Sequence, residues 1–487
     1  MPRLGIVRIC FVREIAASNM TGCRGGTSRI VRAYSHSVPV SGRATPSPFW
    51  LQAIVKDQTP APKLYAWRPE NLSEASKDEC HGRDSPLTRK AASLEDRRRI
   101  YVLGLGNLGR LFATALAKLP SPPPITLVVH RRALLEDWAR HPGIELTTPS
   151  GADLSAPPSA FDIEWWTEEP PPSGPVREVA DGGIVRNLIV ATKAPAAVPQ
   201  VDRLRRYLDE GSSVLFVQNG VSRLWPPQGT VYSEARYVAG RCPSWLLGVT
   251  MHGVYSLGPF RSVFASPADV VVGPVALSEE AEHGPGNYLT EQVLAAPYLA
   301  GRAVPRAQVW MMQLEKLVIN SVINPLTAVL RCRNGVLFAD PSGEAARVMD
   351  MLLEETSRVL QSLVRDESTQ EILRSDPTAE IGTTTTVHQQ DLLDRLSIQK
   401  LRAMLHQVGD KVKDNYSSMY QDATAGKDTE IREFNGWLVE TAKYLDSGLD
   451  VTCHKTLIDL VEKGVVLEPS DLGRYFPAQS ITGNRVP

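Results

Sequence analysis

The sequence has few cysteines and no cluster of metal-binding side chains. Its six cysteines are scattered along 487 residues without a Cys-x-x-Cys pair, and its nine histidines show no His-Glu-x-x-His pattern. Structural zinc sites and disulfide frameworks both need closely spaced ligands or cysteine pairs. We therefore expect a protein of a reducing compartment whose chemistry does not depend on a metal ion.

Long apolar runs and an excess of charge of one sign are also missing. No stretch approaches the roughly 18 uninterrupted apolar residues of a membrane span. Lys plus Arg (53) nearly balances Asp plus Glu (54), so we expect neither a nucleic-acid nor a membrane partner. The composition, 43% hydrophobic and 22% charged, is ordinary for a globular protein with two or more domains.

Although the net charge of the whole chain is close to zero, its N-terminus is basic. Residues 1–34 contain six arginines and a single acid, Glu14. This composition is typical of a mitochondrial transit peptide, and Arg32-Ala33-Tyr34-Ser35 resembles a cut site of the matrix-processing peptidases. We interpret the segment as a transit peptide and expect the protein in the mitochondrial matrix. The alternative is a disordered basic tail on a cytoplasmic protein.

The rest of the chain divides into four parts by composition and periodicity. Residues 35–98 are rich in Pro, Ser, Lys and Asp and are predicted to be a disordered linker. In residues 99–305 short β-rich runs alternate with helical segments, which indicates a parallel sheet covered by helices. Residues 306–475 show helical spacing throughout, and 476–487 are expected to be a flexible tail. The fold class is thus α/β, a Rossmann-type domain followed by an all-helical domain.

Individual elements can be placed by the same patterns. Strands are expected at Ile100–Leu103, Ile125–Val129, Asn187–Ala191 and Ser213–Val217. Helices are expected over 111–119, around Lys316, and over 348–363, 393–408, 430–444 and 456–463. A proline-rich stretch, 170–175, is predicted to be a surface insertion before the third of these strands.

A glycine-rich turn follows the first expected strand and opens a helix. Its sequence is Gly104-Leu105-Gly106-Asn107-Leu108-Gly109. In dinucleotide-binding folds the first glycine allows a tight turn, the second lets the backbone approach a pyrophosphate, and the third lets helix and strand pack closely. The motif alone is weak, but this context favours a dinucleotide site over a glycine turn in an unrelated α/β protein.

The end of the second strand distinguishes between the two nicotinamide cofactors. NAD enzymes commonly place an acid there, whereas this chain has His130-Arg131-Arg132 and no acid before Glu136. A guanidinium group suits the 2′-phosphate of NADP(H) by charge and by geometry. We therefore predict NADP(H) as the cofactor, bound by Arg131 first and Arg132 second. The alternative is a solvated surface arginine pair.

Polar side chains also follow the third and fourth strands. Lys193 follows the third, and Asn219 follows the fourth. Open α/β sheets bind ligands at the carboxyl ends of their parallel strands. Lys193 and Asn219 are therefore candidate contacts of cofactor or substrate.

One face of an apolar helical run carries an unusual set of polar residues. Lys316, Asn320 and Asn324 recur every four residues, so they lie on one face of a helix. A buried lysine is rare unless it is paired, because desolvating an ammonium is costly. The neighbouring amides favour a functional site over the alternative, a solvated stripe on an amphipathic helix.

Together these motifs resemble those of one family. The sequence is similar to ketopantoate reductase (2-dehydropantoate 2-reductase), fungal relatives included, over about residues 99–470. The similarity rests on the glycine turn, Lys193, Gln218-Asn219-Gly220, Lys316 through Asn324-Pro325-Leu326-Thr327-Ala328, Asn415-Tyr416-Ser417-Ser418-Met419-Tyr420-Gln421-Asp422, Asp428-Thr429-Glu430-Ile431 and Asn435-Gly436.

The resemblance implies a fold, a reaction and a set of roles. It implies a C-terminal domain like that of 6-phosphogluconate dehydrogenase, and NADPH-dependent reduction of 2-dehydropantoate to (R)-pantoate in the route to pantothenate and coenzyme A. By the same resemblance Lys316 is the general acid, and Glu430 is its active-site partner and a cofactor contact. Substrate contacts are implied for Asn219, Asn320, Asn324 and Ser418, and Asn219 is implied to contact the cofactor as well. The resemblance also implies that Arg131 binds the 2′-phosphate and that Lys193 lies by the nicotinamide.

These roles agree with the chemistry of ketone reduction. Hydride addition leaves negative charge on oxygen, which a positioned ammonium stabilises and protonates. Partial burial would lower the pKa of Lys316, and a nearby carboxylate such as Glu430 would keep it charged. Glu430 follows Asp428-Thr429, a plausible helix cap, so we expect it in the first turn of a helix, where the helix dipole favours the ionised carboxylate. The alternative role of Glu430 is helix capping alone. Ser418 has the alternative role of a core hydroxyl.

One difference from the family lies at the edge of the cleft and bears on the identity of the substrate. Val263-Phe264-Ala265-Ser266 lacks a His-x-Gly turn that many relatives carry beside the cleft. One alternative is therefore a related NADP-dependent 2-keto or hydroxy acid oxidoreductase, and another is a non-catalytic NADP-binding partner protein in the organelle. An apolar face among the C-terminal helices would permit a homodimer.

Overall fold

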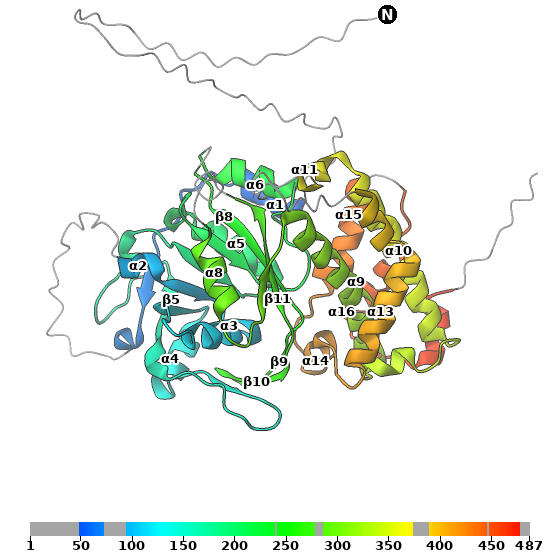
Figure 1. Cartoon of the computed structure of the whole chain (residues 1–487), viewed down its shortest axis with the longest axis horizontal. Coiled ribbons are helices and arrows are strands. Elements are labelled where there is room, and N and C mark those ends of the chain that lie inside the picture. The colour runs from blue at the N-terminus through cyan, green and yellow to red at the C-terminus, as the bar shows by residue number, and fades with distance from the viewer. Residues whose placement is uncertain are drawn as a thin grey trace, which may run out of the picture. The chain divides into compact units, whose positions relative to one another are not determined.

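A computed structural model of the protein describes residues 48–72, 94–238, 241–277, 286–373, 389–445 and 448–477. The expected transit peptide, 1–34, lies outside these residues, as does most of the expected tail. In the described part, strands gather in one half of the molecule and long helices in the other (Figure 1). The predicted fold class is confirmed.

A nine-stranded, mostly parallel sheet forms the centre of the first half. Its strands lie in the order β1 (Tyr65–Trp67), β5 (Phe161–Thr167), β3 (Ile125–Val129), β2 (Ile100–Leu103), β6 (Asn187–Val190), β7 (Ser213–Phe216), β8 (Ser244–Thr250), β11 (Val270–Ala276) and β12 (Gly301–Ala303). Only the β1–β5 and β8–β11 pairs within this sheet are antiparallel. All four strands expected from the sequence are present, with ends that agree to within one residue.

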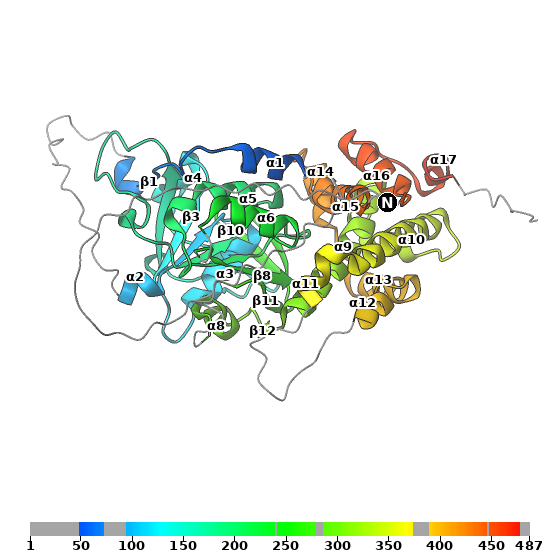
Figure 2. The ribbon, with the colours of Figure 1, turned by 90° about the horizontal axis from the view of Figure 1, so that it is seen from above.

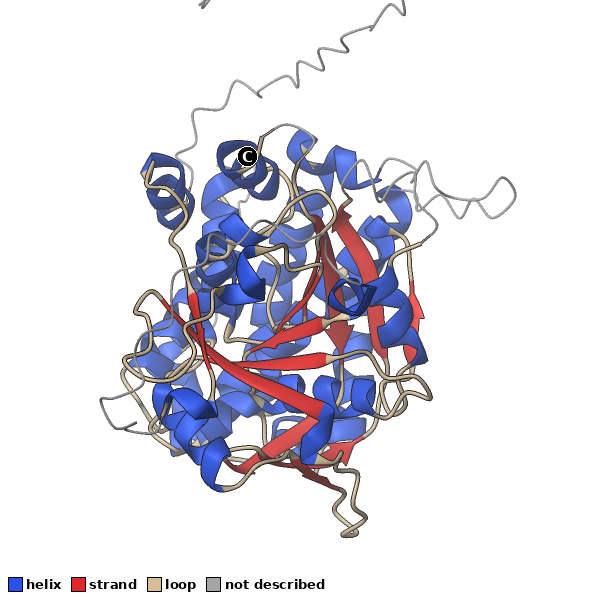
Figure 3. Ribbon diagram, turned by 90° about the vertical axis from the view of Figure 1, so that its left-hand side faces the viewer, coloured by secondary structure: helices blue, strands red, loops and turns tan. Residues whose placement is uncertain are grey.

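Helices cover both faces of this sheet (Figure 3). They include α3 (Asn107–Ala117), α4 (Arg132–Arg140), α5 (Ala194–Arg203), α6 (Gln228–Arg236) and α8 (Tyr288–Ala295). Alternate strand residues face opposite sides, so Ile100 and Val102 belong to one hydrophobic cluster and Tyr101 and Leu103 to another. The second cluster continues into the helical half without a break, which joins the two halves through one core.

A smaller three-stranded sheet lies beside the main one. It consists of β4 (Glu145–Thr147), β10 (Arg261–Ser266) and β9 (Gly253–Gly258). The helix α3, which follows the glycine turn, contacts β9 and β10. This sheet therefore supports the turn from the side.

One long helix joins the two halves. α9 (Arg306–Leu330) packs against β8 and β11 on one side and against the other C-terminal helices on the other. The close approach to β11 depends on Gly273, where a Cβ would lie 2.7 Å from the side chain of Val309. The last strand ends just before α9, close to the domain boundary expected at residue 305, which stays a prediction.

The other α-helices of this half, and one π-helical turn, each pack against α9 or α10. They are α10 (Glu344–Arg365), α11 (Gln370–Leu373), α12 (Gln389–Arg395), α13 (Ile398–Val412), α14 (Ser418–Thr424), the π-helical turn η7 (Arg432–Gly436), α15 (Trp437–Leu445), α16 (Thr452–Glu462) and α17 (Leu472–Tyr475). Within the described residues, no helix combines the length and apolar character needed to cross a membrane.

Several predicted helices differ from those observed. The helices α3, α10 and α16 each begin four residues before the expected start. The helix expected over 393–408 is two helices, because the chain turns at Ser397, whose hydroxyl donates to the Asp394 carbonyl and whose own carbonyl starts α13. The helix expected to begin at Glu430 starts one residue later, with a π-helical turn. Glu430 therefore precedes the helix and does not lie in its first turn.

The prediction of a disordered linker over 35–98 is wrong for residues 48–72. These residues form α1 (Phe49–Lys56) and β1, and α1 packs against α6 (Figure 2). Leu51 and Leu64 are fully buried, and the backbone N–H of Leu64 donates to the Tyr207 hydroxyl at 2.8 Å. A few widely spaced apolar residues anchor this polar segment, and average composition does not reveal such anchors.

Two other expectations concern short segments. Phe476 opens the expected flexible tail, yet it is 1% exposed, and its carbonyl accepts a hydrogen bond from Arg347. The proline-rich insertion at 170–175 lies on the surface for the most part, and the side chain of Asn71 donates to the carbonyls of Ser173 and Pro175. The insertion is thus tied to the N-terminal segment.

We expect residues 48–72 to contribute to global stability. In α1, Leu51 is 1% exposed and Phe49 is 86% exposed. Leu51→Ala should lower the free energy of unfolding by about 2–5 kcal/mol, because it leaves a cavity in the core. Phe49→Ala, in the same helix, should change it little. Equal, negligible effects in chemical denaturation would contradict the folded role of this segment.

Candidate active site

The carboxyl ends of five neighbouring parallel strands meet at one edge of the sheet. β2, β3, β6, β7 and β8 all run in the same direction. The glycine turn, Arg131, Lys193 and Asn219 each follow one of these strands, and Thr250 ends β8. The topology therefore brings together residues that are far apart in the sequence.

The glycine turn has the tight geometry that its sequence predicts. Gly104 has φ = +93°, and a Cβ there would lie 2.8 Å from the backbone N of Thr192. A Cβ at Gly109 would lie 2.0 Å from the Gly104 carbonyl oxygen, so only glycine fits. Gly106 is exposed at the start of α3, and a Cβ there would meet nothing nearer than 3.8 Å. Its backbone is open to a phosphate group.

The other residues of the turn hold it in place. Leu105 and Leu108 pack against the hydrophobic cluster beneath the sheet. The side-chain oxygen of Asn107 accepts a hydrogen bond from Arg110 at 3.0 Å, and Arg110 also donates to the Gly258 carbonyl at 2.7 Å. Burial lowers the pKa of Arg110 to about 10. Arg110, which sequence reasoning missed, thus ties the turn to the three-stranded sheet.

The two arginines after β3 are in different environments. Arg132 forms an ion pair with Glu136 at 2.8 Å, and its guanidinium lies 5.7 Å from the ring centre of Trp67. Arg131 is exposed, and its guanidinium has no hydrogen bond or ion pair with another described residue. Arg131 is therefore the arginine whose guanidinium is available to an anionic ligand, and its role in binding the cofactor stays a prediction.

The ammonium of Lys316 lies at the junction of the two halves. It donates to the side-chain oxygen of Asn219 at 2.8 Å and to the Thr250 carbonyl at 2.5 Å. Burial lowers the pKa of Lys316 to about 8, although the negative charge of Glu430 opposes that shift. The group is therefore a cation that gives up its proton far more readily than an ordinary lysine.

The two asparagines of the same helix face lie beside one another. Asn324 donates to the side-chain oxygen of Asn320 at 3.4 Å, and Asn324 is 8% exposed. Ser418 is exposed at the start of α14, so it is not a core hydroxyl. The buried serine is its neighbour Ser417, whose hydroxyl lies 2.7 Å from that of Thr327 on α9. Ser417 thus fixes α14 to α9.

A second lysine, Lys193, is influenced by the Glu430 carboxylate. Lys193 forms an ion pair with Asp422 of α14 at 2.9 Å. Burial alone would lower the pKa of Lys193, but Glu430 and Asp422 outweigh it and raise the pKa above its ordinary value. No described residue forms a hydrogen bond with the Glu430 carboxylate, which acts on Lys193 and Lys316 through its charge.

Sequence reasoning missed two of these contacts. Asp422 stands four residues after Ser418 in one of the quoted motifs, and this spacing was the available signal. Thr250 acts through its backbone carbonyl, for which no side-chain pattern exists. In the part of the chain that the structure describes, no group of three or more His, Cys, Asp or Glu residues is arranged to hold a metal ion.

Comparisons with known proteins find sequences and structures similar to this chain. Residues 100–276 match the family model described as ketopantoate reductase PanE/ApbA, and residues 308–464 match the one for its C-terminal part. The chain is 41% identical to ketoisovalerate reductase BEA2 of Gibberella fujikuroi, covering 88% of this chain and 98% of that protein. It is 40% identical to ketoisovalerate reductase of Beauveria bassiana, with the same coverage. It is 27% identical to a probable 2-dehydropantoate 2-reductase of Schizosaccharomyces pombe, covering 74% and 95%.

A solved structure shares the fold. The chain resembles a PanE/ApbA family ketopantoate reductase from Ralstonia eutropha with a TM-score of 0.52 and 17% identity, covering 75% of this chain and 98% of that one. At this identity the likeness concerns the fold alone. It agrees with a Rossmann-type domain followed by a helical domain.

The unusual proton affinity of Lys316 can be measured directly. Its pKa should lie near 8, and Glu430→Gln should lower the pKa further, because the charge that favours the ammonium is removed. The measurement is the pH dependence of Lys316 acetylation, followed by mass spectrometry. Glu440→Gln, at an exposed position of α15, is the matched control and should leave the pKa unchanged. A Lys316 that titrates like a free lysine would contradict this description.

Proposed function

Because this chain belongs to the ketopantoate reductase family, we propose that it is an NADPH-dependent reductase of a branched 2-keto acid and that 2-ketoisovalerate is its preferred substrate. Three relatives with 40–41% identity carry the name ketoisovalerate reductase, whereas five relatives named as 2-dehydropantoate 2-reductases, one of them as probable, have 22–27% identity. The first expectation, 2-dehydropantoate on the route to pantothenate and coenzyme A, becomes the second candidate.

The observation that carries the proposal is the environment of Lys316. Its ammonium is held by Asn219 and Thr250 at the sheet edge, and its pKa of about 8 suits proton donation near neutral pH. Reduction of a ketone places negative charge on oxygen, and a fixed ammonium both stabilises that charge and donates the proton. Glu430 favours the charged form of Lys316 between turnovers.

The amides near Lys316 suit the rest of a 2-keto acid. Asn320 and Asn324 lie on the same helix face as Lys316. Ser418 is the first residue of α14, which packs against α9. Amide and hydroxyl groups donate hydrogen bonds to a carboxylate without adding a charge that would compete with the lysine. We assign them to binding of the substrate carboxylate and its neighbouring oxygen.

The residues present fit a nicotinamide dinucleotide. The open backbone at Gly106 and the positive end of α3 suit the pyrophosphate, and Arg131 suits the 2′-phosphate that distinguishes NADPH from NADH. Lys193 lies at the end of β6, toward Glu430, and is assigned to the nicotinamide end. When bound, NADPH supplies the hydride for the reduction.

A panel of substrates tests the proposal and separates its candidates. 2-Dehydropantoate carries a hydroxymethyl group that 2-ketoisovalerate lacks, and a site built to bind that hydroxyl rejects the analogue without it strongly. A site that lacks such a contact discriminates more weakly against the added hydroxymethyl group, so we expect kcat/KM with NADPH to favour 2-ketoisovalerate by about tenfold or more. Lys316→Ala should lower kcat about 100-fold or more, and Lys400→Ala, at an exposed position of α13, should not.

The panel has two outcomes that contradict the first candidate. Preference for 2-dehydropantoate would support the second candidate. Tight NADPH binding without turnover of any branched 2-keto acid would favour a non-catalytic NADP-binding protein.

Cofactor selectivity should depend on Arg131. Arg131→Ala should raise the KM for NADPH by about 10- to 100-fold, the value of a charge-assisted contact to phosphate, and should leave the KM for NADH nearly unchanged. Arg140→Ala, at the exposed end of α4, is the matched control. Equal losses with NADPH and NADH would refute the assignment, and a larger effect of Arg132→Ala would transfer it to that residue.

Two further expectations from the sequence remain proposals. We propose a mitochondrial matrix location on the composition of residues 1–34. We also propose a homodimer, which light scattering on the purified protein would detect.

A further inference from the structure

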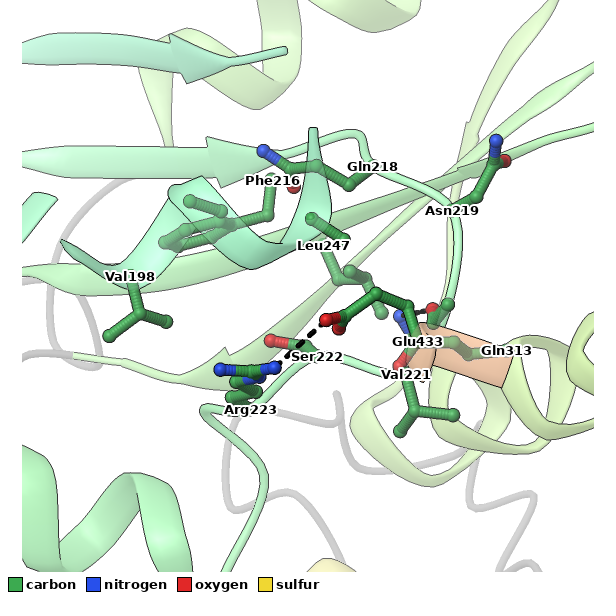
Figure 4. A pocket seen from close by; sticks show the side chains of 13 residues that line it. Val198, Phe216, Gln218, Asn219, Val221, Ser222, Arg223, Leu247, Gln313 and Glu433 are labelled. Atoms are coloured by element: carbon green, nitrogen blue, oxygen red, sulfur yellow. Dashed lines mark hydrogen bonds and ion pairs between the residues drawn. The ribbon is translucent and has the colours of Figure 1, made fainter. Parts of the chain in front are cut away.

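A pocket lies beside the loop that carries Asn219. Its apolar wall includes Val198, Phe216 and Leu247, and its polar wall includes Arg223 and Glu433. Figure 4 shows the side chain of Asn219 pointing away from that charged pair. The loop therefore has two faces, one toward the Lys316 ammonium and one toward this pocket.

The charged pair on the pocket side is largely shielded from water. Arg223 donates to the Glu433 carboxylate at 2.9 Å, and their side chains are 24% and 9% exposed. Burial raises the pKa of Glu433, while Arg223 counteracts that shift. A partly buried pair of this kind holds its partners in one geometry, because separating them would leave Glu433 charged and unpaired.

The backbones at this point are also in direct contact. Gly220 has φ = +87°, and a Cβ there would lie 3.1 Å from the carbonyl oxygen of Glu433. The Gly220 carbonyl accepts a hydrogen bond from Gln313 at 2.9 Å, and Gln313 accepts one from Trp225 at 2.7 Å. Gln313 lies three residues before Lys316 on α9. The loop is thus held between α9 and the π-helical turn η7.

The folded N-terminal segment reaches the same pair. The guanidinium of Arg223 lies 5.4 Å from the ring centre of Trp50 in α1, within the range of a cation–π interaction. Residues 48–56 therefore contribute to the position of Arg223.

Each partner of this ion pair is close in the sequence to a group that acts on Lys316. Asn219, which accepts its hydrogen bond, precedes Arg223 by four residues. Glu430, which acts through its charge, precedes Glu433 by three residues, and its carbonyl accepts the Glu433 backbone N–H at 3.0 Å. The pair thus spans the gap between the two segments that surround the ammonium.

We propose that Arg223 and Glu433 are positioning residues: their ion pair joins the Asn219 loop to the Glu430 turn and so fixes both groups relative to the Lys316 ammonium. The inference rests on the proposed function in taking Lys316 as the proton donor. It adds that the catalytic geometry is set from the far side of the loop, by residues that touch neither substrate nor cofactor.

The test is a double-mutant cycle with a matched control. Arg223→Met should lower kcat about tenfold or more, because small misplacements of a catalytic group are costly, while the KM for NADPH changes less than twofold. In an Asn219→Ala background the same substitution should cost twofold or less, since one group that it positions is already gone. Arg223→Lys should restore part of kcat.

The matched control is Arg186→Met. Arg186 forms a similar ion pair with Asp209, at 3.1 Å and with 34% and 18% exposure, at the opposite edge of the sheet. The substitution Arg186→Met should leave kcat unchanged. Equal losses from Arg223→Met in both backgrounds, or equal losses from Arg223→Met and Arg186→Met, would overturn the proposal. If Arg223→Met does not fold, Glu433→Gln takes its place in the cycle, with the same expected and contradicting results.

A second readout is independent of the substrate. Acetylation of Lys316 reports its environment whether or not a keto acid is turned over. Arg223→Met should increase the acetylation rate of Lys316 at pH 7 at least twofold, because the Glu430 charge is no longer held near the ammonium, and Arg186→Met should not. An unchanged rate would overturn the positioning role even if wild-type turnover fails, and a wild-type protein without turnover would refute only the proposed reaction.

Discussion

The structure depends on keeping one ammonium charged in a partly buried place. Desolvation lowers the pKa of Lys316 to about 8, and the negative charge of Glu430 limits that shift. Two oxygens, from Asn219 and Thr250, accept hydrogen bonds from the ammonium. Each of these three groups comes from a different element, so the environment of Lys316 exists only when both halves of the chain are folded together.

Helix α9 makes this arrangement rigid. It carries Lys316, packs against β11 where Gly273 allows close approach, and anchors α14 through the Thr327–Ser417 contact. The hydrophobic cluster on one face of the sheet continues past α9 into the helical half. A catalytic group on a buried helix is held more precisely than one on a loop, and here the loop residue, Asn219, is itself fixed by its neighbours.

The sequence predicted those parts whose signal is local. Short β-rich runs located the strands, glycine spacing located the turn at Gly104, and four-residue spacing placed Lys316 and Asn324 on one helix face. It failed where long-range contacts decide the outcome. The anchors of residues 48–72 are isolated residues such as Leu51, and the oxygen at Thr250 belongs to the backbone, so neither leaves a pattern in the sequence.

The central claim is that Lys316 is the proton donor in reduction of a 2-keto acid. The most direct measurement is the pH dependence of kcat with NADPH and saturating 2-ketoisovalerate. A donor must be protonated, so kcat should be constant below the pKa of Lys316, about 8, and should fall with the loss of one proton as the pH rises through it. A kcat that stays constant up to the ordinary pKa of lysine, about 10.4, would contradict the account.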